Sequence, residues 1–132
     1  MKKILLIFLL FFSCNVVAEL KVWYCNPEAA AGLTFKNGTY VTQGFIVERA
    51  IIKQVGKEFT FPKEHSVLFN HTVECSTSDY VAICDTGVGK SFYLSYSDGH
   101  AVSSTTNIGW LYSSIGIPEK DLIVVAWKCE SF

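Results

Sequence analysis

The sequence predicts a small, mainly β domain with one short N-terminal helix, whose strands form an antiparallel meander, either a curved sheet or a small barrel. Three observations lead to this fold class. Short segments with apolar residues at alternate positions recur along the chain, separated by glycine-containing turns. An even number of cysteines follows a predicted export signal, which is typical of a disulfide-stapled domain. Residues 26–32 carry helix-capping residues.

The first 18 residues predict a cleaved signal peptide. Lys2 and Lys3 precede an apolar run, Ile4 to Phe12, that is too short to span a bilayer, and Ala18 is a small residue of the kind found at cleavage sites. We expect cleavage after Ala18, a single domain over residues 19–132 and a periplasmic or secreted location. The alternative is a lipoprotein acylated at Cys14.

The charge of residues 19–132 argues against a nucleic-acid partner. This part of the chain has nine basic and twelve acidic side chains, a net charge of −3, and its basic residues are scattered. Nucleic-acid binding requires clustered lysine or arginine to displace counterions. We therefore expect no nucleic-acid partner, and we expect no stable membrane span because no second long apolar stretch follows.

Two disulfides are predicted among the four cysteines of this part. Three pairings are possible for Cys25, Cys75, Cys84 and Cys129. Cys75 and Cys84 flank a short polar stretch, which favours a local bridge. Cys25 would then pair with Cys129 and tie the first strand to the last.

The N-terminal part predicts a strand followed directly by the helix. Val22–Cys25 is the expected strand. Asn26 is then an expected N-cap, Pro27 occupies the first helical position and Gly32 ends the helix. A helix this short is not stable alone in water, and we therefore expect it to pack on the sheet as a plug or lid.

The middle of the chain predicts a hairpin and a half-buried strand. Ala50–Val55 and Glu58–Phe61 flank Gly56-Lys57, which suits a two-residue turn. Alternation over Val67–Cys75 predicts a strand with His71 on its apolar face.

The C-terminal part predicts three more strands. Phe92, Leu94 and Tyr96 share one face of a strand, and Ser97–His100 contains an Asp-Gly turn that makes a second hairpin. Leu122–Cys129 is apolar on both faces apart from Lys128, which predicts a central strand.

The stretch Cys84–Ser91 resembles two functional motifs. Gly89-Lys90-Ser91 is similar to the end of a phosphate-binding loop, but that loop has glycine where Cys84 stands and continues into a helix. Asp85-Thr86-Gly87 is similar to the aspartic-protease triplet, although a chain this small would have to dimerise to supply a second carboxylate. A glycine-rich turn explains both.

No catalytic, cofactor or metal site is predicted. His65, His71 and His100 lack the spacing of metal ligands, and no nucleophile elbow is present. Asn37-Gly38-Thr39 and Asn70-His71-Thr72 match the glycosylation sequon, a match we interpret as incidental in an exported protein of bacterial type.

Aromatic side chains are the candidate binding residues. They are numerous for a domain of this size and could line a pocket or an interface. The candidates are Trp23, Trp110, Tyr112 and Trp127.

The segment Val22–Leu33, followed by Asn37–Tyr40 and Phe45, resembles the start of a family of small uncharacterised periplasmic or secreted bacterial proteins. That family begins aromatic-x-Cys-x-x-Glu-x-Ala-x-Gly-Phe. Here Leu33 replaces the phenylalanine, and Trp127-Lys128 stands where the family has glycine before its last cysteine. The resemblance implies an exported protein and no particular activity.

Three functions follow as hypotheses. The first is a non-enzymatic envelope or secreted binding protein for a small apolar ligand or a protein partner. The second is an inhibitor of a cell-wall enzyme such as lysozyme, acting through the turn Tyr96–Gly99. The third, a hydrolase using Asp85 or the histidines, is the least supported.

Overall fold

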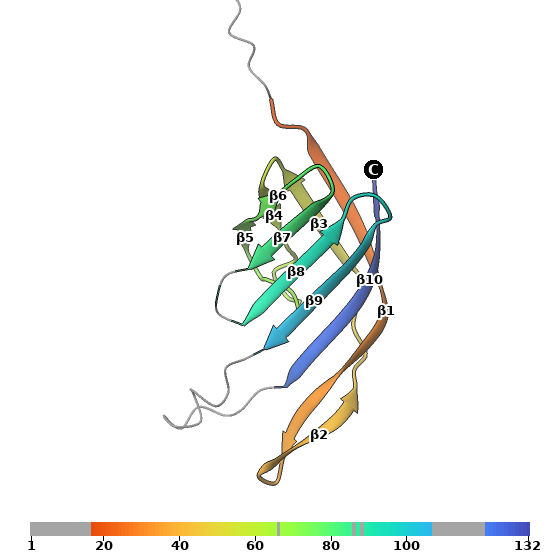
Figure 1. The fold of residues 1–132 in the computed structure, drawn as a ribbon, viewed down its shortest axis with the longest axis vertical. Coiled ribbons are helices and arrows are strands. Elements are labelled where there is room, and N and C mark those ends of the chain that lie inside the picture. The colour runs from red at the N-terminus through yellow and green to blue at the C-terminus, as the bar shows by residue number, and fades with distance from the viewer. Residues whose placement is uncertain (1–16, 66, 86, 88, 107–120) are drawn as a thin grey trace, which may run out of the picture.

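The described residues form one antiparallel sheet of ten strands. The computed structural model describes residues 17–65, 67–85, 87, 89–106 and 121–132, and these residues contain no helix (Figure 1). The strands are β1 (Leu20–Lys36), β2 (Thr39–Gly44), β3 (Ala50–Val55), β4 (Glu58–Thr60), β5 (Thr72–Glu74), β6 (Ser76–Thr77), β7 (Val81–Asp85), β8 (Lys90–Ser95), β9 (His100–Thr106) and β10 (Leu122–Ser131).

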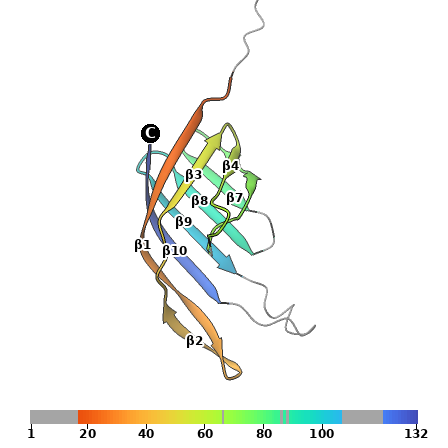
Figure 2. The ribbon, with the colours of Figure 1, turned by 180° about the vertical axis from the view of Figure 1, so that it is seen from behind.

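The sheet curls into a nearly closed, barrel-like form. Its strand order is β5-β4-β3-β1-β10-β9-β8-β7-β6, and β2 pairs with β1 beside this path. The two end strands, β5 and β6, follow each other in the chain with only Cys75 between them, so the ends of the sheet meet. The Cys75 amide also donates a 2.8 Å hydrogen bond to the Lys57 carbonyl. Figures 1 and 2 show the strands curving round a common interior, with β2 extending beyond it, away from the C-terminus.

The predicted strands and turns around this interior are largely confirmed. β3 and β4 form the hairpin expected on either side of Gly56-Lys57, and Gly56 has the positive φ of 58° that favours glycine. Phe92 and Leu94 point inward from β8, and the chain turns between β8 and β9 at Ser97–His100 as expected. β10 is central, between β1 and β9.

The predicted helix over residues 26–32 is wrong, because this segment is the middle of β1. Its capping and propensity signals are local, and a helix this short is marginal in water. As a strand, the segment pairs along one side with β10, and its last residues, Ala31 and Gly32, pair along the other side with β2. These long-range ladders satisfy backbone groups that a short helix would leave open at its ends.

A β-bulge lets β1 keep its buried face through this segment. Pro27 pairs with Trp127 and Ala29 with Ala126, so Glu28 is the extra residue. A bulge tolerates proline, which cannot donate to the ladder. The bulge also changes which residues of β1 face inward. Before the bulge the inward residues have odd numbers, as the buried Trp23 and Cys25 show. After the bulge they have even numbers, and they are Ala30, Gly32 and Thr34.

The loop between β4 and β5 fills one part of the interior. Phe61, Val67, Leu68 and Phe69 are all buried there, and the Phe61 ring lies 4.9 Å from Phe69 and 5.4 Å from Phe92. The strand predicted over Val67–Cys75 is therefore wrong in its first half. A loop folded into the barrel buries successive side chains, whereas a strand would expose every second one.

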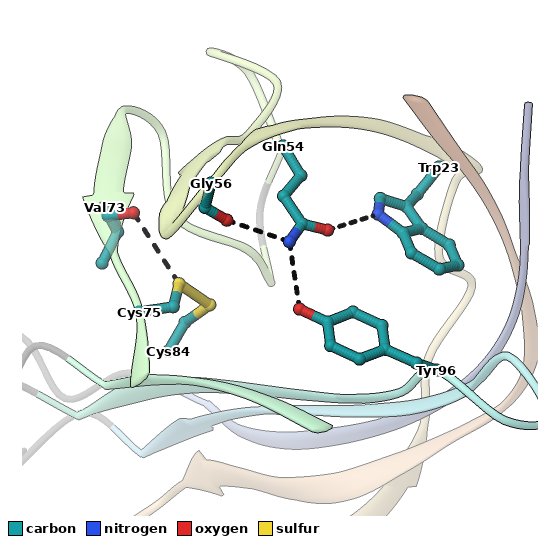
Figure 3. Close-up of a disulfide and its surroundings, with 7 residues drawn as sticks. All are labelled: Trp23, Gln54, Gly56, Val73, Cys75, Cys84 and Tyr96. Carbon is teal, nitrogen blue, oxygen red and sulfur yellow. Dashed lines mark hydrogen bonds between the residues drawn. A yellow bond between two sulfur atoms is a disulfide. The ribbon is translucent and has the colours of Figure 1, made fainter. Parts of the chain in front are cut away.

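Both predicted disulfides are present. Cys25 and Cys129 are directly paired in the β1–β10 ladder, and their bridge joins positions 104 residues apart. Cys75 and Cys84 join the β5–β6 junction to β7 (Figure 3). One bridge therefore crosses the middle of the sheet and the other lies where its ends meet.

Candidate functional site

The aromatic residues predicted to bind a partner lie either inside the barrel or outside the described residues. Trp23 is 5% exposed and Trp127 is fully buried. Trp110 and Tyr112 lie outside the residues that the structure describes.

Trp23 belongs to a hydrogen-bonded network around Gln54 (Figure 3). Its indole Nε1 donates to Gln54 Oε1 at 3.0 Å, and Gln54 Nε2 donates at 3.0 Å to both the Tyr96 hydroxyl and the Gly56 carbonyl. Burial raises the pKa of the Tyr96 phenol above its ordinary value, and the Gln54 hydrogen bond partly opposes this shift. The side-chain amide of Gln54 has both of its donor hydrogens and its oxygen in use, which indicates a structural role for this network.

The interior is filled by side chains. Phe59, Phe69, Phe92 and Trp127 are among the largest fully buried residues, and the Trp127 indole donates a 2.9 Å hydrogen bond to the Ser103 hydroxyl. A small apolar ligand would have to displace this packed core. The barrel interior is therefore a poor candidate for a binding site.

The described residues at the ends of β7 and β8 make the contacts of a turn rather than those of a phosphate-binding loop. Lys90 begins a strand instead of a helix, and its ammonium donates a 2.7 Å hydrogen bond to the Leu68 carbonyl. The Asp85 carboxylate accepts a 2.7 Å hydrogen bond from the Gly87 amide, as in an ordinary Asx turn.

The three histidines lie in separate parts of the fold. His71 is exposed just before β5 and contacts the Asn70 side chain. His65 packs against the Trp127 ring at 5.6 Å. Among the described residues no three His, Cys, Asp or Glu side chains are arranged to hold a metal ion.

His100 lies between two carboxylates on the surface. Its Nδ1 is 3.2 Å from Asp98 Oδ2 and its Nε2 is 3.9 Å from Glu28 Oε2, and all three side chains are at least half exposed. Hydrogen bonds from the Ser95 hydroxyl and the His100 amide hold the pKa of Asp98 well below its usual range. Exposed charges of this kind are strongly screened by water, so this cluster is a weak candidate site.

The most unusual exposed feature is the arm formed by β2 and the second half of β1. Asn37 and Gly38 have φ of 51° and 84°, as a two-residue type I′ turn requires, and they join the two strands. All six residues of β2 are exposed, and the chain carries no charge from Asn37 to Val47. In the described part of the chain β2 pairs with β1 alone, so its outer edge is open.

The outer edge of β2 presents a defined set of backbone groups. The Phe45 amide donates to the Ala30 carbonyl, and pairs that exchange hydrogen bonds alternate along an antiparallel ladder. Gln43, Val41 and Thr39 therefore bond to β1. The backbone N–H and C=O groups that point away from β1 are those of Tyr40, Thr42 and Gly44.

Sequence analysis missed this arm, although a signal was present. Asn-Gly between β-prone segments is a strong hairpin signal, and Asn37-Gly38 was interpreted only as part of a glycosylation sequon. The preceding residues were assigned to a helix, so no first strand was left for the turn to connect.

None of the residues that the structure describes forms a helix able to cross a membrane. Comparison of the chain with known protein families, curated proteins and solved structures finds no match. The resemblance carried by Val22–Leu33 stays a prediction.

Proposed function

We propose that this chain is an exported, non-enzymatic protein-binding module that takes an extended segment of a partner protein onto the outer edge of β2. The open, uncharged edge of β2 is the observation that carries this proposal. Two disulfides agree with an oxidising compartment outside the cytoplasm.

The edge supports strand addition for a physical reason. An open edge offers unpaired donors and acceptors to any extended chain, and proteins usually blunt such edges with charge, proline or a covering segment. β2 contains no charged residue and no proline, and Tyr40 and Val41 expose apolar surface on it. These properties are those of a strand that accepts another strand.

A protein partner agrees with the structure better than a small apolar ligand or the inhibition of a cell-wall enzyme does. A small apolar ligand would need space in the barrel, which Trp127 and its neighbours fill. A cell-wall-enzyme inhibitor acting through Tyr96–Gly99 would need free groups on that turn. The Tyr96 hydroxyl is bonded to Gln54, and the Asp98 carboxylate to the His100 amide.

A proline substitution at the edge tests the proposal. Thr42→Pro removes a backbone N–H that points outward and leaves the ladder with β1 intact, whereas Thr42→Val keeps the N–H and serves as the matched control. A display library of unstructured decapeptides would be selected on the immobilised full chain. We expect clones that bind the wild type and Thr42→Val and are lost with Thr42→Pro. Clones that bind Thr42→Pro equally well, or an empty selection, would contradict strand addition.

A further inference from the structure

We propose that the partner segment is a two-sided strand, which places an aromatic side chain beside Tyr40 and polar side chains on the opposite side of the sheet. This inference rests on the proposed function, because pairing with β2 determines which side chains of the segment lie beside those of β2. It adds the chemistry that the module recognises in its partner.

The two sides of β2 have different neighbours on β1. Directly paired residues of adjacent strands lie on the same side of a sheet, so Tyr40 shares one side with Phe35, and Val41 shares the other side with Thr34. Tyr40 and Val41 are 38% and 39% exposed. Since both side chains are equally accessible to a segment paired with β2, their surroundings decide what each side accepts.

The Tyr40 side is an apolar surface. The Phe35 ring packs edge-on against the Tyr40 ring, with the ring centroids 5.0 Å apart. The paired strands β1 and β10 extend this surface with uncharged apolar residues, which are Ala31, Leu33, Leu122 and Val124. A segment on the edge of β2 would contact Tyr40 from the direction opposite to Phe35. An aromatic side chain there would enlarge the apolar surface without removing a charge from water.

The Val41 side is polar, and its groups bond to one another. The Thr34 hydroxyl donates to the Asp121 carboxylate, and Lys36 Nζ donates a 3.3 Å hydrogen bond to Gln43 Oε1. An aromatic ring on this side would shield these groups from water and offer them no hydrogen bond in return. A polar side chain, such as threonine, therefore suits this side better.

Gly44 is a separate indication that another chain approaches β2. It lacks a positive φ, and a Cβ on it would meet nothing within 4 Å. Neither its backbone conformation nor a close neighbour among the described residues therefore requires glycine. A glycine in a strand often marks the place where a ligand or another backbone approaches closely. Gly44 thus agrees with a second chain lying against this end of β2.

Synthetic peptides of seven residues would test the inference. Each alternates threonine with valine at positions 2, 4 and 6, and each carries capped ends and a fluorophore. One of the valines is replaced by phenylalanine or, in the matched peptide, by serine, and all three positions are tested. Dissociation constants would be measured by fluorescence anisotropy with the full chain and with its variants Tyr40→Ser and Val41→Ser. Val41→Ser is the matched control, because Val41 is as exposed as Tyr40 and lies on the other side.

We expect the phenylalanine peptide to bind the wild type about tenfold more tightly than its serine counterpart at the position that lies beside Tyr40. This ratio should fall to about threefold in Tyr40→Ser and persist in Val41→Ser. Intermolecular nuclear Overhauser effects should connect the phenylalanine ring to the Tyr40 ring and not to the Val41 methyl groups. A ratio that Tyr40→Ser leaves unchanged, or that Val41→Ser lowers equally, would overturn the inference.

Thr42→Pro separates this inference from the proposed function. Loss of all peptide binding in Thr42→Pro, together with equal binding of the phenylalanine and serine peptides to the wild type, would leave strand addition standing and reject the aromatic preference. A phenylalanine preference that Thr42→Pro retains at full affinity would support the contact with Tyr40 and reject strand addition. No binding of any peptide would count against both.

Discussion

Gln54 shows how one polar residue organises this barrel. It is buried on β3, where the alternation of the strand places an inward side chain, and it joins Trp23 on β1 to Tyr96, the residue that follows β8. A buried donor that loses its acceptor has no hydrogen bond to offset the free energy of removing it from water. Gln54 therefore joins β1, β3 and the turn after β8 through polar contacts that an apolar residue could not replace.

Gln54→Leu should lower the free energy of unfolding by about 2 kcal/mol, because the Trp23 indole N–H is left buried without an acceptor. Urea unfolding measures this change. Lys53→Gln on the adjacent, exposed position is the control and should stay within about 0.5 kcal/mol of the wild type. A Gln54→Leu variant as stable as the control would show that the network contributes nothing.

Tyr96 should make stability fall at alkaline pH. Burial raises its pKa in the folded state above the ordinary value of 10.0, so the unfolded chain releases the phenol proton first. The stabilisation is complete below pH 10 and is lost as the pH rises through the folded-state pKa. Urea midpoints should fall more steeply above pH 10 for the wild type than for Tyr96→Phe, and the two proteins should have parallel profiles below pH 10. Profiles that stay parallel above pH 10 would refute this assignment.

The elements differ in how well the sequence predicted them. The β3–β4 hairpin was predicted because its alternation and its turn glycine are both local signals. The strand over residues 26–32 could not be predicted locally, because its partner β10 is distant in the sequence and its partner β2 was itself unassigned. The open edge of β2 could not be predicted at all, since it depends on where every other strand lies.

The middle of β1 packs closely against β10 at Gly32, and a substitution at this residue tests that packing. A Cβ at this position would lie 1.8 Å from the Leu122 carbonyl oxygen of β10, whereas a Cβ on Gly44 would meet nothing within 4 Å. Gly32→Ala should therefore cost about 3 kcal/mol through overpacking. Gly44→Ala should be close to neutral, and equal stabilities in urea for the two variants would contradict the observed β1–β10 packing.

The whole molecule depends unequally on its two disulfides. In the chain-entropy description, a bridge across 104 residues stabilises by about 5 kcal/mol and one across 9 residues by about 3 kcal/mol. We expect Cys25→Ala/Cys129→Ala to lose more stability than Cys75→Ala/Cys84→Ala, as measured by thermal unfolding of the purified variants. The opposite order would show that joining the sheet ends matters more than loop length.

The central claim for the whole molecule is that a barrel-like sheet presents one strand edge to a partner. Hydrogen exchange of backbone amides, measured by NMR, tests it directly. In the free chain the outward amides of Tyr40, Thr42 and Gly44 should exchange fast, and those of Val41 and Gln43 more slowly. A peptide obtained by selection should slow the three outward amides specifically. Outward amides that are already protected in the free chain, or that are unchanged when the peptide binds, would contradict the account.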